Sequence, residues 1–153
     1  MTDTDQITDA LTREHRAIDG GIAAFLADTV DATPLREAIS ALRRHIYLEE
    51  TFLFPPLKAT MMMPIFVMLR EHGELWRGMD ETEARLDEAQ RAGDTDIQQQ
   101  CRDLLTLLDA HNSKEEPIIY PRADADLAPD VRAELAEFIA IGAYPDGWAS
   151  ATA

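Results

Sequence analysis

Basic residues, cysteine and long apolar runs are all scarce in this chain of 153 residues. Lysine and arginine number 14 against 29 aspartates and glutamates, which gives a formal net charge of −15 at pH 7. A surface this acidic repels phosphate backbones and anionic lipid headgroups, so we expect neither nucleic acid nor a membrane surface as a partner. No apolar run in the sequence is long enough to cross a bilayer.

Cysteine occurs once, at Cys101, which excludes an intrachain disulfide and a cysteine-rich zinc site. Residues 1–5 carry neither the basic residues nor the apolar run of a signal peptide. Together these observations predict a cytoplasmic protein. The hydrophobic content of 46%, with only 7 glycines and 8 prolines, is typical of a folded protein rather than a disordered one. We expect one domain over residues 1–153.

Apolar residues recur with a period near 3.6 in four long stretches, which predicts four helices joined by short links. Pro34 is expected to follow an N-cap at Thr33, and Pro64 to open the third helix. No segment alternates with period two, so the fold class is all-α. The prediction is an antiparallel up-down four-helix bundle with its core at about residues 4–121. Residues 122–153 are expected to form a short helix and a loose tail. The expected helices span about 4–28, 34–57, 64–91 and 95–121, with a C-cap at Gly93, an N-cap at Asp94 and the short helix near 129–141.

Each of the four predicted helices carries one of the four histidines, and each histidine lies on the apolar stripe of its helix. A single histidine in such a position is more often a satisfied core residue than a ligand. Four of them together favour a shared site. The histidines are His15, His45, His72 and His111.

Two of these histidines precede a glutamate by four residues, in the pairs His45 and Glu49, and His111 and Glu115. A spacing of four places both side chains on one helix face, so the carboxylates also turn inward. Carboxylates are seldom buried unless they are paired or bound to metal. The residue counts from each link place all six side chains at one height, because a helix rises ~1.5 Å per residue. This pattern predicts a metal site of four imidazoles and two carboxylates.

The sequence also repeats internally. His45-x-x-x-Glu-Glu-x-x-x-Phe-Pro55 is matched by His111-x-x-x-Glu-Glu-x-x-x-Tyr-Pro121, and Arg13-Glu-His15 is matched by Arg70-Glu-His72. Two similar helical hairpins would therefore face each other, with one metal near each hairpin. The adjacent glutamates could accept a hydrogen bond from an imidazole N–H, although a solvated face explains them equally well. They are Glu14, Glu50, Glu71 and Glu116.

The order of these motifs resembles the hemerythrin-like, HHE cation-binding family. That family carries a lone His, His-x-x-x-Glu, a lone His and His-x-x-x-Glu on four successive helices. The resemblance covers about residues 4–121 and implies a non-haem di-iron centre with an oxo or hydroxo bridge. It would place His15 and His45 on one iron and His72 and His111 on the other. Glu49 and Glu115 would bridge the two irons. Imidazole and carboxylate ligands also suit zinc and manganese, so iron is the choice implied by the resemblance.

Trp76 marks a departure from the oxygen-carrying members, which have a further histidine four residues after the third-helix histidine. Those carriers also tend to supply the last carboxylate five residues after the fourth-helix histidine, where this chain has Glu116. We choose Glu115, because it mirrors Glu49. Both metals would then keep an open position, which favours reduction or disproportionation of a small molecule over reversible oxygen binding.

Our expectation is a di-iron protein that reacts with hydrogen peroxide, nitric oxide or dioxygen, with catalase-like or nitric-oxide-consuming turnover as the enzymatic form. The reductant is unknown, and the chain is expected to be a monomer or a homodimer. One alternative is a module that binds or senses oxygen or iron without turnover. Another is an iron donor for iron–sulfur cluster repair. Relatives of the last kind usually carry an extra Cys-containing N-terminal domain, which this sequence lacks.

Overall fold

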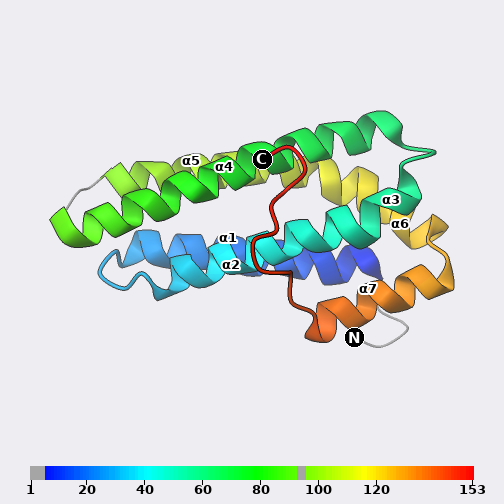
Figure 1. Cartoon of the computed structure of the whole chain (residues 1–153), viewed down its shortest axis with the longest axis horizontal. Coiled ribbons are helices and arrows are strands. Elements are labelled where there is room, and N and C mark those ends of the chain that lie inside the picture. The colour runs from blue at the N-terminus through cyan, green and yellow to red at the C-terminus, as the bar shows by residue number, and fades with distance from the viewer. Residues whose placement is uncertain (1–5, 93–95) are drawn as a thin grey trace.

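Four long helices form the body of the structure, which is a computed structural model describing residues 6–92 and 96–153 (Figure 1). Helices α1 and α2 form one antiparallel pair, and α4 and α5 form the other (Figure 1). Within the described ranges all regular secondary structure is helical, which confirms the predicted all-α bundle. The long helices are α1 (Ile7–Ala27), α2 (Thr33–Leu48), α4 (Met62–Ala92) and α5 (Asp96–Lys114).

Two of these helices continue through a short π-helical segment into a further helix. Helix α2 runs through η1 (Glu49–Leu53) into α3 (Phe54–Leu57), and α5 runs through η2 (Glu115–Ile119) into α6 (Tyr120–Asp126). The short helix α7 (Pro129–Ile141) then packs against η1 and α2. The predicted fourth helix therefore extends a few residues beyond its expected end near Pro121.

The π-helical segments occupy the same place in both sequence repeats. Each begins at the first glutamate of a Glu-Glu pair and is followed by an aromatic residue and a proline, Pro55 or Pro121. A proline has no N–H for the α-helical hydrogen bond and its ring crowds the carbonyl four residues earlier. A wider turn relieves this conflict, and such turns frequently occur at functional sites. The helix prediction from the sequence did not include these π-helical segments.

Helix ends differ from expectation at several points. Thr33 is the first residue of α2 rather than its N-cap, because its backbone N–H bonds to Asp31 Oδ1 at 3.0 Å and the helix begins one residue early. Helix α4 begins at Met62, so Pro64 lies within its first turn, where a missing N–H costs nothing. The predicted start at Thr4 and the caps at Gly93 and Asp94 lie outside the described residues.

Buried apolar residues gather in two clusters, one toward each end of the bundle. One cluster includes Phe25, Leu75 and Leu108, and the other includes Leu11 and Met68. The four histidines fall between these clusters along their helices, at the positions where the apolar stripe is interrupted. The bundle therefore encloses one buried polar layer between two apolar regions.

Residues after α7 run across the bundle rather than forming a loose tail, and they pass over α2 to reach α4 (Figure 1). Trp148 meets the rings of Tyr47 and Trp76 edge to face, with centroids 5.0 and 5.4 Å away. Thr152 Oγ1 donates to the Leu69 carbonyl at 2.6 Å. Aromatic packing and hydrogen bonds thus hold this segment in place.

No helix within residues 6–92 and 96–153 combines the length and the apolar character that crossing a bilayer requires.

Candidate metal centre

Six buried side chains converge in the polar layer, and they are the six that the sequence predicts as ligands. Each has at most 3% of its surface exposed. Helix α1 supplies His15, α2 supplies His45, α4 supplies His72 and α5 supplies His111. The first residues of η1 and η2 supply the two glutamates, Glu49 and Glu115.

These side chains form two groups that share both glutamates. The first group consists of His15, His45, Glu49 and Glu115, and the second of Glu49, His72, His111 and Glu115. Within each group the potential ligand atoms all lie within 4.8 Å of one another. Two such groups indicate a binuclear metal site.

Each glutamate directs one carboxylate oxygen toward each group. Glu49 Oε2 lies 3.3 Å from His45 Nε2, whereas Glu49 Oε1 lies 3.1 Å from His72 Nε2. Glu115 follows the same pattern, with Oε1 at 3.2 Å from His15 Nε2 and Oε2 at 3.4 Å from His111 Nε2. Carboxylates in this arrangement can bridge two cations.

A carboxylate from a different helix holds the outer nitrogen of each histidine. Glu116 Oε2 lies 2.8 Å from His15 Nδ1, and Glu14 Oε1 lies 2.8 Å from His45 Nδ1. The second group repeats the pattern. There Glu50 Oε2 lies 2.8 Å from His72 Nδ1 and Glu71 Oε1 lies 3.0 Å from His111 Nδ1.

All four glutamates that the sequence suggested as imidazole partners therefore play that part. When Nδ1 donates its hydrogen to a carboxylate, the tautomer is fixed and Nε2 presents a lone pair to the interior of the site.

Charges inside the site compensate one another. Burial by itself would lower the pKa of His111, but the carboxylates of Glu115 and Glu71 outweigh it and raise that pKa to about 10. Burial would likewise raise the pKa of Glu115, but the neighbouring His111 and His15 hold it well below its ordinary value. In the absence of metal, imidazolium and carboxylate groups thus balance each other. A metal ion must displace these protons, because metal binding requires neutral imidazole.

Tyr120 is the residue of this site that the sequence analysis missed. Its ring is fully buried, and its hydroxyl donates toward Glu49 Oε2 at 2.6 Å or Glu115 Oε1 at 2.8 Å. Burial and the charges of these two carboxylates raise the pKa of Tyr120 well above its ordinary value, so the phenol is protonated. The available signal was the sequence repeat, in which Tyr120 is the counterpart of Phe54.

Within the part of the chain that the structure describes, three buried atoms of the second group lack a hydrogen-bond partner, namely Glu49 Oε1, His72 Nε2 and Glu115 Oε2. Leaving a buried polar atom unsatisfied costs about 1–3 kcal/mol, and more for a charged group. A cation among these atoms would satisfy all three at once. Imidazole nitrogens and carboxylate oxygens are also a donor set that iron, manganese and zinc accept. The residues present therefore fit a pair of metal ions.

Other residues considered in the sequence lie outside the two groups. Trp76 packs in the apolar cluster, with the Arg43 guanidinium 4.6 Å from its ring centroid. Cys101 is buried in the same cluster, as expected of a small core residue. Glu116 turns outward to His15 Nδ1, whereas Glu115 turns inward to His15 Nε2 and His111 Nε2.

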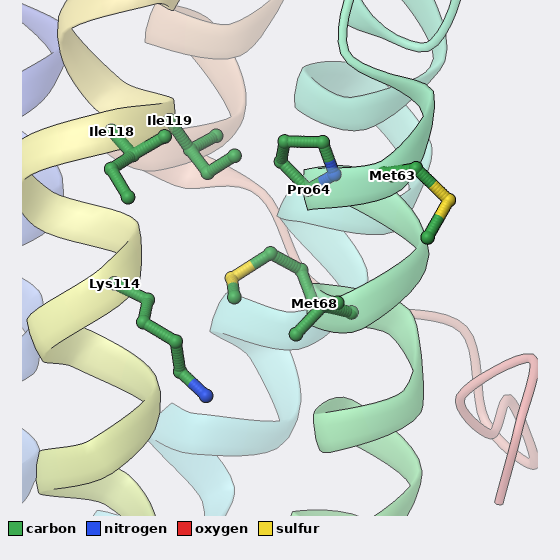
Figure 2. A pocket seen from close by; sticks show the side chains of 7 residues that line it. Met63, Pro64, Met68, Lys114, Ile118 and Ile119 are labelled. Carbon is green, nitrogen blue, oxygen red and sulfur yellow. The ribbon is translucent and has the colours of Figure 1, made fainter.

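An apolar pocket of about 280 Å³ opens between the N-terminal part of α4 and η2, near the second group (Figure 2). Met68 and Ile119 line it, and each lies four residues from a member of that group, His72 or Glu115. Lys114 stands at one side of the pocket and pairs with Glu71 (Figure 2). The complete lining is Met63, Pro64, Val67, Met68, Lys114, Ile118 and Ile119.

Comparisons with curated proteins and with solved structures gave no significant match. The sequence does match the family described as Hemerythrin HHE cation binding domain, over residues 6–123. This match includes both repeats and all six converging side chains. The chain therefore belongs to the hemerythrin HHE cation-binding domain family.

Proposed function

We propose that this protein is a non-haem di-iron protein that reacts with small oxidants, of which hydrogen peroxide, nitric oxide and dioxygen are the candidates. The observation that carries the proposal is the shared pair of glutamates, each with one oxygen in each histidine group. Such bridging carboxylates suit two adjacent cations rather than one. His15 and His45 would hold one ion, and His72 and His111 the other.

Bound iron would supply Lewis acidity and one-electron redox chemistry. The protein's own contribution is positioning and exclusion of water. The four outer carboxylates orient the imidazoles, and the two apolar clusters close the bundle on either side of the polar layer. Electrostatic interactions are stronger in a site this deeply buried than they are in water.

Zinc and manganese also accept this donor set, so the first measurement is the metal itself. Elemental analysis of protein expressed with iron available should give about two irons per chain. The iron-loaded protein should then consume hydrogen peroxide or nitric oxide faster than the metal-free protein. Equal rates with and without iron would contradict the proposed reactivity, and a stable oxygenated spectrum that reverses under vacuum would favour an oxygen-binding role instead.

We further propose that small apolar molecules reach the site through the pocket between α4 and η2. The support is its apolar lining and the position of Met68 and Ile119, each four residues along its helix from His72 or Glu115. Ile118, which is 49% exposed at this pocket, can be enlarged without disturbing the core. Ile118→Trp should slow the binding of nitric oxide several-fold while the iron content stays unchanged.

The matched control for this experiment is Leu107→Trp, a change at a residue that is 37% exposed and does not line the pocket. Stopped-flow mixing of the ferrous protein with nitric oxide gives both rates. Equal rates for the two variants would show that entry follows another path.

A further inference from the structure

The phenol oxygen of Tyr120 lies close to all four ligand atoms of the first group. It is 2.9 Å from His15 Nε2 and 3.1 Å from His45 Nε2. It is also 2.6 Å from Glu49 Oε2 and 2.8 Å from Glu115 Oε1. A hydroxyl donates one hydrogen and can accept at most two, so four neighbours within 3.1 Å are one more than hydrogen bonding ordinarily serves.

These distances match those between neighbouring donors on one metal ion. Two bonds of ~2.1 Å at a right angle place their donor atoms ~3.0 Å apart. The His15 and His45 Nε2 atoms are 3.0 Å apart, and each lies 3.2 or 3.3 Å from the nearest carboxylate oxygen of the group. The phenol oxygen thus lies 2.6–3.1 Å from all four of these atoms, as a fifth donor on the same ion would.

Among residues 6–92 and 96–153, no phenol oxygen takes the equivalent place in the second group. Phe54 is the counterpart of Tyr120 in the sequence repeat, and its ring stacks on His72 with centroids 5.3 Å apart. The Tyr120 ring lies 5.5 Å from that of His15. The unpartnered atoms of the site all belong to the second group. The two metal positions are therefore alike in histidines and carboxylates but differ by one oxygen.

We propose that Tyr120 is a metal ligand, binding through its phenolate oxygen the ion held by His15 and His45. On binding, the phenol proton leaves to solvent and an oxygen lone pair forms the metal–oxygen bond, without any change in oxidation state. A nearby cation makes this ionisation favourable, although the metal-free site opposes it. The inference deepens the proposed function, because the second position then has fewer protein donors and becomes the one that takes the small molecule.

The identity of the ligand also bears on the chemistry. Phenolate is anionic, so it stabilises the more highly charged ferric ion relative to the ferrous one. Reversible oxygen carriage requires a stable ferrous form, which this ligand disfavours. With Tyr120 bound, only the second position would stay open, contrary to the expectation that both metals keep one. The preference of phenolate for the ferric ion is then what favours consumption of an oxidant over reversible oxygen carriage.

The test uses the ferric form of the full chain, its visible absorption and its resonance Raman spectrum. A coordinated tyrosine gives a phenolate-to-iron charge-transfer band and enhanced ring vibrations that shift when tyrosine is ring-deuterated. The chain contains 3 tyrosines, so the double variant Tyr47→Phe/Tyr144→Phe retains only Tyr120. We expect the full signature in the wild-type protein and in this double variant.

Two further variants complete the test. Tyr120→Phe removes only the hydroxyl and should abolish the signature, and adding Phe54→Tyr to it should restore a tyrosine ligand at the other position. Two irons per chain without the signature in the wild-type protein would overturn this inference alone. Failure to bind iron would overturn the proposed function as well, whereas a clear signature without peroxide or nitric oxide consumption would leave the ligand standing and contradict the function.

Discussion

Ser150 donates its hydroxyl hydrogen to Glu50 Oε2 at 2.6 Å, and the same oxygen accepts the Nδ1 hydrogen of His72 at 2.8 Å. The backbone N–H of Ala151 donates to the other oxygen of Glu50 at 3.0 Å. The segment after α7 therefore holds the carboxylate that orients one of the four histidines. Its end is part of the support of the metal centre rather than a separate appendage.

Replacing Glu50 should weaken metal binding without removing a ligand. Glu50→Gln keeps the shape of the side chain but loses the charge that favours the His72 Nδ1 hydrogen. We expect the affinity for metal to fall about 10- to 100-fold, the usual effect of such outer partners. Competition with a chelator measures it. Glu88→Gln, on the exposed side of α4, is the matched control and should leave the affinity unchanged.

Gly73 tests whether the C-terminal segment docks on α4. A Cβ atom at this position would overlap the hydroxyl and the carbonyl of Thr152. Gly73→Ala should displace the segment and lower the free energy of unfolding by about 1–3 kcal/mol, as overpacking usually does. Gly20→Ala is the control, because no described residue outside its own stretch of helix lies within 4 Å of the added atom.

Replacing a helical glycine by alanine should raise the free energy of unfolding by about 0.5–1 kcal/mol where there is space for the added methyl group. Chemical denaturation of both variants shows whether the free energy of unfolding falls for Gly73→Ala and rises for Gly20→Ala. A Gly73→Ala protein as stable as the Gly20→Ala protein would contradict the docked segment.

The neighbours Glu115 and Glu116 should respond differently to the same substitution. Glu115 faces both groups, so Glu115→Gln should lower the metal content and the melting temperature together. Glu116 contacts only the outer nitrogen of His15 within the site, so Glu116→Gln should retain the metal with weaker affinity. Elemental analysis and thermal unfolding measure both. Full metal content in the Glu115→Gln protein would contradict its place as a bridging ligand.

Cys101 provides a prediction on pH that is independent of the metal centre. Burial raises the pKa of its thiol to about 11, from 9.0. The folded protein should therefore hold ~100-fold less thiolate at pH 8 than the unfolded chain, and alkylation by iodoacetamide should be slower by a similar factor. Mass spectrometry of native and denatured protein compares the two rates.

The raised pKa of Cys101 also predicts how the free energy of unfolding changes with pH. A thiol with a raised pKa contributes stability that is present below pH 9.0 and lost as the pH rises toward about 11, because only the unfolded chain ionises in that interval. The difference in unfolding free energy between the wild-type protein and Cys101→Ala should decrease between these pH values. A constant difference would show that the thiol is not shielded.

The sequence by itself determined the helices, their antiparallel order and the six converging side chains. Apolar periodicity indicates which face of each helix is buried, and a spacing of four places His45 with Glu49 and His111 with Glu115 on those faces. These are local properties of an α-helix, so they can be read along the chain. The repeat likewise led to the prediction of Glu115 rather than Glu116 as the second inward carboxylate.

The pairing of the outer carboxylates was decided only by the tertiary structure. Glu14 follows Arg13 and precedes His15 in the sequence, yet it bonds to His45. Glu116 lies beside Glu115 and yet bonds across the bundle to His15. Neighbours in the sequence point to different sides of a helix, so which imidazole each one meets depends on how the helices pack.

Tyr120 shows most clearly where the sequence reached its limit. Five residues along an α-helix turn a side chain about 140° away from its starting face, which places Tyr120 off the face of Glu115. The π-helical turn of η2 brings the two together, so that the hydroxyl lies 2.8 Å from Glu115 Oε1. The sequence determined which residues could form a metal site. The wider turn and the packing of four helices decided that a phenol lies among them, because both depend on backbone geometry that residue spacing does not specify.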